Sequence, residues 1–282
     1  MKTREQLIDD LLNLAFAEDI GDGDHTTLST IADDTMGRQQ LIVKEEGILA
    51  GVEIARMVFE KFDPELKMTV FINDGAHVKP GDIAFVVEGR KRSLLQTERI
   101  MLNIMQRMSG IATMTARYQA RLEGLHTRVL DTRKTTPGMR MLEKEAVKIG
   151  GGTNHRIGLF DMILIKDNHI DHAGGIANAL RNVREYLART GKKLKIEIEV
   201  RSLDDIREVL EIGGVDRIMF DNFTPELTRE AVKLVGGRVE TESSGGITLD
   251  TLRAYGEAGV DFISVGALTH SVKCLDMSFK AC

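Results

Sequence analysis

The sequence predicts an α/β protein, with an N-terminal α+β open sandwich domain at residues 1–110 and an incomplete (β/α) barrel of TIM-like type at residues 111–282. Short apolar runs alternate with helical stretches from about Thr127 onward, as in consecutive strand–helix units around a parallel sheet. Charged or glycine-rich residues follow one apolar run after another. A barrel places its active site at that end of its strands, so the same pattern predicts where function lies.

The N-terminal part mixes helical and strand-like patterns. Apolar residues at helical spacing predict a helix from Thr3 to Phe16, with Thr3 as its cap. A second, longer helical pattern runs from Ser93 to about Leu122, in which Gly110 indicates close packing or a break. The strand-like pieces between these helices lie at 38–44, 68–72 and 83–88. We also expect the last helix of the chain to pack back on this domain.

Six apolar runs are the expected strands of the barrel, at 128–130, 162–165, 194–200, 217–220, 238–241 and 262–265. The helices expected between the later strands lie at 202–212, 224–234 and 248–258. Each of these helices begins with Ser or Thr followed by acid, which is a helix N-terminal signature. Glycine turns follow the last two strands and not the first, which favours a barrel over a doubly wound sheet.

Composition and charge exclude several classes of function. The net charge of -5 argues against nucleic acid as an electrostatic partner. No apolar run approaches the roughly 18 residues that a membrane span needs, and the charged first residues lack the apolar core of a secretory signal. Cys274 and Cys282 are too few to form a disulfide framework. We therefore expect a cytoplasmic protein that binds neither membrane nor nucleic acid.

Two glycine turns form the expected phosphate site. Glycine lets a backbone approach an anion, and a helix N-terminus offers unpaired N–H groups. Either turn alone would more simply be a tight turn, but two on successive strands favour phosphate binding. The expected phosphate-binding residues are Ser244, Gly245, Gly246, Val265, Gly266 and Ala267.

A cationic set follows the earlier strands. Arginine binds carboxylates with two parallel hydrogen bonds, whereas lysine acts on phosphates as a point charge. Lys166 directly follows an apolar run, so we expect it in the mouth of the barrel, where an anionic ligand must compensate its charge. A structural salt bridge to Glu199 or Asp221 is the alternative interpretation. The set is Arg133, Lys134, His155, Arg156 and Lys166.

Three acidic residues complete the candidate site. Glu197 and Glu199 share one face of an expected strand, and Glu199 lies nearer the mouth. A carboxylate there could hold Mg²⁺ or ribose hydroxyls, or stabilise positive charge on a sugar carbon, and Asp221 is placed similarly. For Glu197, an interior salt bridge is an equally good interpretation.

Together these motifs resemble the quinolinate phosphoribosyltransferase family, also called nicotinate-nucleotide pyrophosphorylase (carboxylating). The resemblance covers nearly the whole chain, and the Thr-Arg-Lys and Asn-His-Arg blocks are its most specific parts. The matching stretches are 98–103, 109–113, 131–138, 150–156, 164–169, 221–223, 242–247 and 266–271, with Gly23-Asp24-His25-Thr26-Thr27 near the start.

The resemblance implies a transferase that joins quinolinate to phosphoribosyl pyrophosphate and releases nicotinate mononucleotide, pyrophosphate and carbon dioxide, in NAD biosynthesis. It implies a homodimer or a multiple of dimers, in which Arg99 enters the neighbour's site. Lys134 and Lys166 would face the pyrophosphate, and Glu199 and Asp221 would hold ribose hydroxyls and Mg²⁺, making these four the catalytic residues. The residues implied to bind quinolinate are Arg99, Arg133, His155, Arg156 and Lys166.

Three alternatives stay open from the residues alone. A relative on the same fold could use nicotinate or another base, although five cations exceed what one carboxylate and a phosphate require. A Schiff-base aldolase would use Lys166 as its nucleophile. A non-catalytic phosphosugar binder would leave Glu199 and Asp221 without a purpose.

Overall fold

A computed structural model of the protein describes residues 2–282, and its contacts divide the chain into two compact units. The sandwich unit comprises the residues up to Ala116, Lys134–Gly151 and Ala267–Cys282. The barrel unit comprises Arg117–Arg133 and Gly152–Gly266. Both units are therefore discontinuous in sequence, whereas a single boundary after residue 110 was expected.

An antiparallel sheet of four strands forms the centre of the sandwich unit, in the order β12-β1-β5-β3. The last helix of the chain, α11 (Ala267–His270), belongs to this unit, and the chain then ends in β12, which pairs with β1 from Gln39↔Ala281 to Val43↔Met277. Met277 and Phe279 alternate with more exposed neighbours, so one face of β12 enters the core. The strands are β1 (Met36–Val43), β3 (Lys67–Val70), β5 (Ile83–Arg90) and β12 (Met277–Ala281).

Helices cover this sheet, and three phenylalanines join the two layers. Phe59 of a helix contacts Phe85 and Phe279 of the sheet, with ring centroids 6.3 and 5.9 Å away. Gly110 lies inside a continuous helix and marks close packing, since a Cβ there would lie 2.3 Å from the Lys273 carbonyl oxygen. The helices with residues in this unit are α1 (Arg4–Asp19), α2 (His25–Thr30), α3 (Val52–Phe62), α4 (Lys91–Arg121), α5 (Arg140–Ile149) and α11 (Ala267–His270); β2 (Gly47–Ile48) pairs with β4 (His77–Val78).

The barrel unit contains a six-stranded parallel sheet in the order β6-β11-β10-β9-β8-β7. Each strand from β7 to β11 lies beside the next one in sequence, and β11 lies beside β6. The α/β fold class and the singly wound, incomplete barrel are thereby confirmed. The strands are β6 (Arg128–Leu130), β7 (Met162–Ile165), β8 (Lys195–Val200), β9 (Arg217–Asp221), β10 (Glu240–Ser244) and β11 (Phe262–Ser264).

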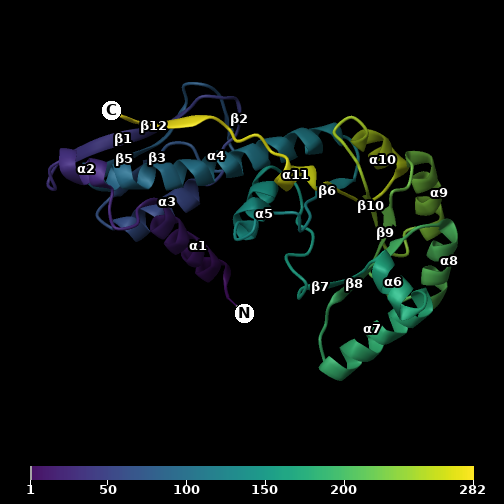
Figure 1. Ribbon diagram of the computed structural model, residues 1–282. Coiled ribbons are helices and arrows are strands. Elements are labelled where there is room, and N and C mark those ends of the chain that lie inside the picture. The colour runs from purple at the N-terminus through teal and green to yellow at the C-terminus, as the bar shows by residue number, and fades with distance from the viewer. Residues whose placement is uncertain (1) are drawn as a thin grey trace. The chain divides into compact units, whose positions relative to one another are not determined.

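Helices that connect the strands follow one another along the outside of this sheet (Figure 1). The Ser202 and Thr224 side chains accept hydrogen bonds from the first turns of α8 and α9, as their positions predict. The last of them, α10, begins at Leu252 and not at Thr248, because Thr248 and Thr251 form a hydrogen-bonded turn before it. These helices are α6 (Asp167–Ala173), α7 (Ile176–Thr190), α8 (Leu203–Ile212), α9 (Pro225–Val235) and α10 (Leu252–Ala258).

Among residues 2–282, no helix combines the length and apolar character needed to cross a membrane.

Candidate functional site

The carboxyl ends of the parallel strands meet at one edge of the barrel sheet, and most predicted site residues lie there. Lys166 follows β7, Glu199 lies near the end of β8, and Asp221 ends β9. Ser244 ends β10 and is in register with Asp221. Because every neighbouring pair in this sheet is parallel, the four residues project from the same edge.

The Asn-His-Arg segment runs alongside β6 at the open edge of this sheet. The Thr153 N–H donates to the Val129 carbonyl at 2.8 Å, and the Asp131 N–H donates to the Thr153 carbonyl at 3.2 Å. The His155 N–H then donates to Oδ1 of the buried Asp131 at 2.8 Å. These bonds fix the backbone that carries His155 and Arg156.

The His155 ring points inward to two buried glutamates. Its Nε2 lies 3.1 Å from Oε2 of Glu197 and 3.6 Å from Oε2 of Glu242. Both glutamate side chains are 0% exposed. On the other side of the ring, Nδ1 accepts a 2.7 Å hydrogen bond from the Arg156 N–H. Both ring nitrogens of His155 therefore face protein groups.

Arg217 lies between the strands that carry these glutamates. In the sheet register it is opposite Glu197 on β8 and Glu240 on β10. Its Nη1 donates to Glu242 Oε2 at 3.0 Å, and its Nη2 donates to Glu240 Oε2 at 2.9 Å. The guanidinium also stacks 4.2 Å from the centroid of the Phe262 ring. We call Glu197, Glu242, Arg217 and His155 the buried quartet.

A metal ion is a poor fit to the quartet, although His155, Glu197 and Glu242 bring three potential ligand atoms within 4.8 Å of one another. Because Nδ1 accepts a backbone N–H, the proton of the neutral imidazole is on Nε2. A protonated nitrogen cannot ligate a metal, and the Arg217 guanidinium already supplies a cation beside Glu242. The quartet is therefore better described as a hydrogen-bonding and charge-pairing cluster.

Burial raises the pKa of both glutamates to about 7. For Glu242, the negative charge of Glu197 raises the pKa further, while Arg217 opposes the shift for both residues. Within residues 2–282, both oxygens of Glu197 and Oε1 of Glu242 are buried with no donor in hydrogen-bonding geometry. A proton shared between the two carboxyl groups would supply one of the missing hydrogen bonds. The two glutamates therefore titrate as a unit near neutral pH.

Arg156 is the cation whose charge the protein disfavours most clearly. Burial lowers the pKa of its guanidinium, and the positive charge of Arg133 lowers it further. Arginine nevertheless stays protonated at physiological pH. The two guanidinium groups repel each other, and an anion bound beside them would offset this repulsion.

Lys166 forms an ion pair with Glu199. Its side chain is not buried, which differs from the expectation. Its Nζ lies 3.1 Å from Glu199 Oε2, and its side chain is 48% exposed while that of Glu199 is 6% exposed. A half-exposed, paired ammonium differs from the desolvated lysine that Schiff-base chemistry requires. The geometry therefore argues against the aldolase alternative.

The turn after β10 packs closely against the end of β9. Gly245 has φ +101°, and a Cβ there would lie 2.2 Å from Oδ1 of Asn222. Asn222 itself has φ 57° and donates through Nδ2 to Asp221 Oδ2 at 2.7 Å. Only glycine fits at 245, which brings the Ser244–Gly246 backbone beside Asp221. This turn was expected to lead directly into a helix. It does not, because α10 begins later, at Leu252.

Lys134 and Ala267 belong to the sandwich unit, where a local network holds the Lys134 backbone. The Thr269 hydroxyl donates to the Lys134 carbonyl at 2.8 Å. Nearby, Arg107 Nη2 donates to the buried Glu143 at 2.8 Å, and Glu143 accepts the Thr136 N–H at 3.2 Å. Residues 134–136 are therefore anchored by buried side chains of this unit.

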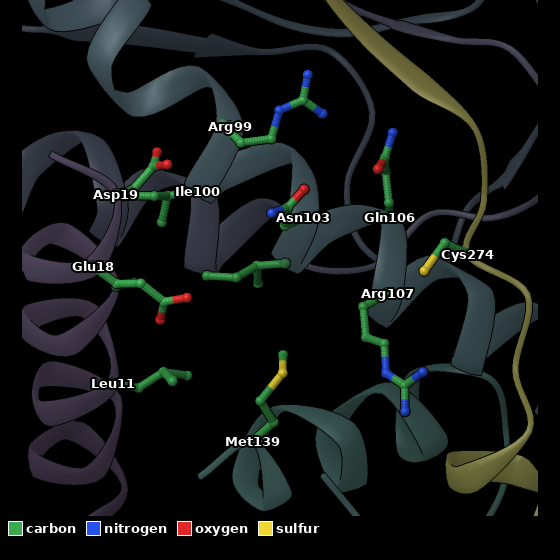
Figure 2. A pocket seen from close by; sticks show the side chains of 12 residues that line it. Leu11, Glu18, Asp19, Arg99, Ile100, Asn103, Gln106, Arg107, Met139 and Cys274 are labelled. Carbon is green, nitrogen blue, oxygen red and sulfur yellow. The ribbon is translucent and has the colours of Figure 1, made fainter. Parts of the chain in front are cut away.

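Arg99 lies on α4 at a pocket of about 410 Å³ within the sandwich unit (Figure 2). The exposed Arg99 and the part-buried Arg107 extend from one side, and Glu18 of α1 faces them across the pocket. An exposed arginine on this unit is available to a second molecule. Arg99 therefore belongs to the sandwich unit. The other residues expected to bind quinolinate belong to the barrel unit: Arg133, His155, Arg156 and Lys166.

Sequence reasoning missed two members of the quartet, Arg217 and Glu242. The strand predicted at 238–241 ended one residue before Glu242, so this residue was given no role in the site. The observed β10 runs from Glu240 to Ser244. The alternation of Glu240, Glu242 and Ser244 was the signal that could have identified an interior-facing acid.

Two family models match the chain. Residues 24–109 match the model described as quinolinate phosphoribosyl transferase, N-terminal domain, and residues 111–280 match the corresponding C-terminal domain. Among curated proteins, the chain is 47% identical over 286 residues to "Nicotinate-nucleotide pyrophosphorylase [carboxylating], chloroplastic" of Oryza sativa subsp. japonica, covering 96% of this chain and 76% of that protein. It is 44% identical to a probable enzyme of the same name from Bacillus subtilis (strain 168), covering 95% and 91%.

Solved structures agree with this result. The structure of NadC from Streptococcus pyogenes superimposes with a TM-score of 0.93 at 40% identity, covering 99% of this chain and 97% of that one. The nicotinate-nucleotide pyrophosphorylase from Francisella tularensis superimposes with a TM-score of 0.92 at 38% identity, covering 100% and 98%. Matches to both domain models and near-complete coverage of these relatives leave one assignment: the chain belongs to the quinolinate phosphoribosyl transferase family.

Proposed function

We propose that the protein joins quinolinate to phosphoribosyl pyrophosphate and releases nicotinate mononucleotide, pyrophosphate and carbon dioxide, in NAD biosynthesis. The observation that carries the proposal is the Arg133–Arg156 pair, in which burial and mutual repulsion disfavour the Arg156 charge. A dicarboxylate offsets such repulsion better than a monocarboxylate does, because it brings two negative charges. Family membership and close structural relatives support the same activity.

Quinolinate would bind to the basic side chains of the barrel edge, with His155 in the same wall. Arg133, Arg156 and Lys166 lie in the barrel unit beside the carboxyl ends of β6 and β7. Binding to these cations would orient the pyridine nitrogen toward the sugar carbon. Holding two reactants in this way is a major source of rate enhancement without any covalent intermediate.

Phosphoribosyl pyrophosphate would bind across the ends of the later strands. The Ser244, Gly245 and Gly246 turn, with Val265, Gly266 and Ala267 after β11, would receive the 5-phosphate through backbone N–H groups. Lys134 and Lys166 would face the pyrophosphate and stabilise its negative charge as it leaves.

Glu199 and Asp221 would act on the ribose. Their carboxylates follow neighbouring strands, where they can accept hydrogen bonds from ribose hydroxyls and stabilise positive charge developing on the sugar carbon. Two carboxylates at one sheet edge fit Mg²⁺, which prefers oxygen ligands and uses few protein groups when substrate phosphates supply the rest. When bound there by Glu199 and Asp221, the ion would neutralise charge on the pyrophosphate.

Carbon dioxide would leave without help from a nucleophile of the protein. Attachment of the sugar to the pyridine nitrogen makes the ring cationic, and a cationic ring accepts the electrons of the breaking carbon–carboxylate bond. The same carbon then takes a proton. The residues of the site accordingly supply position and charge.

We further propose that Arg99 completes the site of a neighbouring subunit in a homodimer or a multiple of dimers. Support comes from its exposure on the sandwich unit, at a pocket formed by that unit alone. Mixing inactive Arg99→Ala and Lys166→Met proteins tests this. Recovery of activity after subunit exchange is expected, since mixed dimers contain one intact site, and no recovery would contradict sharing.

We propose the cytoplasm as the site of action, because both cysteines, Cys274 and Cys282, are exposed and free. Several plant relatives are named chloroplastic or mitochondrial, whereas two Nicotiana relatives and the Bacillus subtilis relative carry no organelle in their names. Cell fractionation with an antibody to the protein tests the assignment, and recovery in an organelle would overturn it.

A substrate comparison tests the proposed activity. The purified protein, phosphoribosyl pyrophosphate and Mg²⁺ are mixed with quinolinate or, separately, with nicotinate. We expect nicotinate mononucleotide and an equal amount of carbon dioxide from quinolinate only. Product from nicotinate alone would contradict the dicarboxylate assignment.

Amide variants test the roles of the acids. Glu199→Gln and Asp221→Asn should reduce turnover about 10²- to 10³-fold, by analogy with loss of one electrostatic group at a transition state. Quinolinate binding, measured by calorimetry, should be largely retained. Unchanged turnover would contradict the roles assigned to these residues.

A further inference from the structure

We infer that Glu197 and Glu242, held by Arg217, are positioning residues for quinolinate that act through the His155 ring on Arg156. The inference rests on the proposed function in one respect, namely that Arg156 binds a quinolinate carboxylate. The contacts that carry it lie within the barrel unit.

The first contact series runs from the sheet to the ring. Arg217 is only 11% exposed and donates to Glu242 Oε2 at 3.0 Å. That same oxygen lies 3.6 Å from His155 Nε2, while Glu197 Oε2 lies 3.1 Å from it. Strands β8 and β10, on either side of β9, therefore hold two carboxylates against one edge of a ring that is 6% exposed.

The second series runs from the ring to the site. Nδ1 of His155 accepts the Arg156 N–H at 2.7 Å, so the ring fixes the backbone from which the Arg156 side chain starts. Among residues 2–282, the Arg156 guanidinium donates a single hydrogen bond, a long one of 3.4 Å to the Met162 carbonyl. Backbone placement thus matters more for this arginine than it would for a side chain held by strong local bonds.

The orientation of the ring follows from these contacts. An Nδ1 that accepts requires the neutral tautomer with its proton on Nε2, and that proton faces the two glutamates. A ring flipped about its Cβ–Cγ bond would put Cδ2 where Nδ1 accepts the Arg156 N–H and Cε1 where Nε2 faces the carboxylates. Negative charge behind the ring therefore selects one orientation and one tautomer.

Kinetics of isosteric variants test the inference. Glu197→Gln and Glu242→Gln should each raise KM for quinolinate about tenfold, the equivalent of one weakened charged hydrogen bond. KM for phosphoribosyl pyrophosphate should change less than about twofold, because the turns proposed to bind its phosphate are not part of the proposed quinolinate site. The matched control is Asp63→Asn, which alters a buried carboxylate paired with Arg90 in the sandwich unit and should leave KM for quinolinate unchanged.

A double-mutant cycle tests whether the effect passes through the ring. In a His155→Asn background, Glu197→Gln should raise KM for quinolinate no further, because the intermediate group is gone. Additive effects of the two substitutions would overturn the inference. An active wild-type protein with unchanged KM in the glutamate variants would also overturn it, whereas a wild type inactive on quinolinate would instead contradict the proposed function.

A spectroscopic measurement of the ring is independent of turnover. In a ¹⁵N-histidine-labelled protein, two-bond ¹H–¹⁵N correlations report the tautomer of each ring, and His155→Asn identifies the relevant signal. We expect Nε2 protonated and Nδ1 unprotonated for His155 in the wild-type protein. A protonated Nδ1, or an unprotonated Nε2, would overturn the inference.

Discussion

Two buried clusters of acid and arginine, one in each unit, differ in how many donors each carboxylate receives. In the sandwich unit, the single carboxylate of Asp63 accepts bonds from Arg90 at 2.7 and 3.0 Å, from Ser93 Oγ at 2.6 Å and from the Glu65 N–H at 3.1 Å. These bonds, with Arg90 foremost, hold its pKa below the ordinary value. A fully satisfied carboxylate of this kind stabilises the fold.

In the barrel unit, two carboxylates share one guanidinium and one neutral imidazole. Burial raises the pKa of both Glu197 and Glu242 to about 7, the opposite of the shift at Asp63. Too few donors reach these glutamates, so their charge costs stability instead of adding to it. The difference indicates that the Asp63 cluster serves the fold, whereas the quartet serves the basic site above it.

The largest expected effect on stability comes from removing the guanidinium of the quartet. Arg217→Met should lower the free energy of unfolding by about 3–5 kcal/mol, because two buried carboxylates lose their compensating cation. Arg90→Met is the control, and it should cost less, since Ser93 Oγ and the Glu65 N–H still donate to Asp63 after the guanidinium is removed. Urea unfolding of both variants measures the difference. Equal losses of unfolding free energy would contradict the proposed difference between the two clusters.

The next effect is a dependence of stability on pH. Between about pH 4.5 and pH 7 the folded protein holds protons on Glu197 and Glu242 that the unfolded chain has released, so stability should fall as pH rises through this window. A shift from 4.5 to about 7 corresponds to about 3 kcal/mol for one carboxyl group. Glu242→Gln should flatten this slope, and an unchanged slope in urea unfolding would contradict the raised values.

The Asp63 cluster should show a smaller effect of opposite sign. Its pKa is lowered, so its stabilisation is present above the unfolded value of 3.8 and is lost as pH falls through the lower folded value. Asp63→Asn should cost about 2 kcal/mol at neutral pH, the typical worth of hydrogen bonds to a charged group. The loss of stability caused by Asp63→Asn should become smaller in acid. Thermal unfolding at several pH values measures it, and a loss that does not change with pH would contradict the lowered pKa.

The smallest stability effect is expected at the exposed end of the barrel edge. Lys166→Met should change the free energy of unfolding by less than about 1 kcal/mol, because the Lys166 side chain is half exposed and surface ion pairs contribute little. Turnover should nevertheless be lost, since the ammonium would face both substrates. A stable but fully active variant would contradict the functional role of Lys166.

Much of the fold could be predicted, since local pattern determines it. The runs at β7 and β9 are largely apolar, β8 alternates isoleucine with glutamate, and Ser202 and Thr224 mark helix starts where they were expected. The final strand β12 could not be predicted in the same way. It is a strand because β1, more than two hundred residues earlier in the chain, offers an edge to pair with.

The residues of the candidate site also differ in whether local sequence pattern or the pairing of distant segments determines their position. Lys166, Glu199 and Asp221 were found because each follows a recognisable strand. Arg217 and Glu242 were missed because their importance depends on register between neighbouring strands, which places Arg217 opposite both Glu197 and Glu240. Charge alone did not show that Lys166 would be exposed and paired, since that depends on the position of Glu199.

The most direct test of the account uses quinolinate labelled with ¹³C in its 2-carboxylate. The protein, phosphoribosyl pyrophosphate and Mg²⁺ are incubated with this substrate, and label is followed in carbon dioxide and in the nucleotide. We predict that every nucleotide formed is matched by one labelled carbon dioxide and that the nucleotide contains no label. Label retained in the nucleotide, or a nucleotide formed without carbon dioxide, would contradict a basic site built for a dicarboxylate.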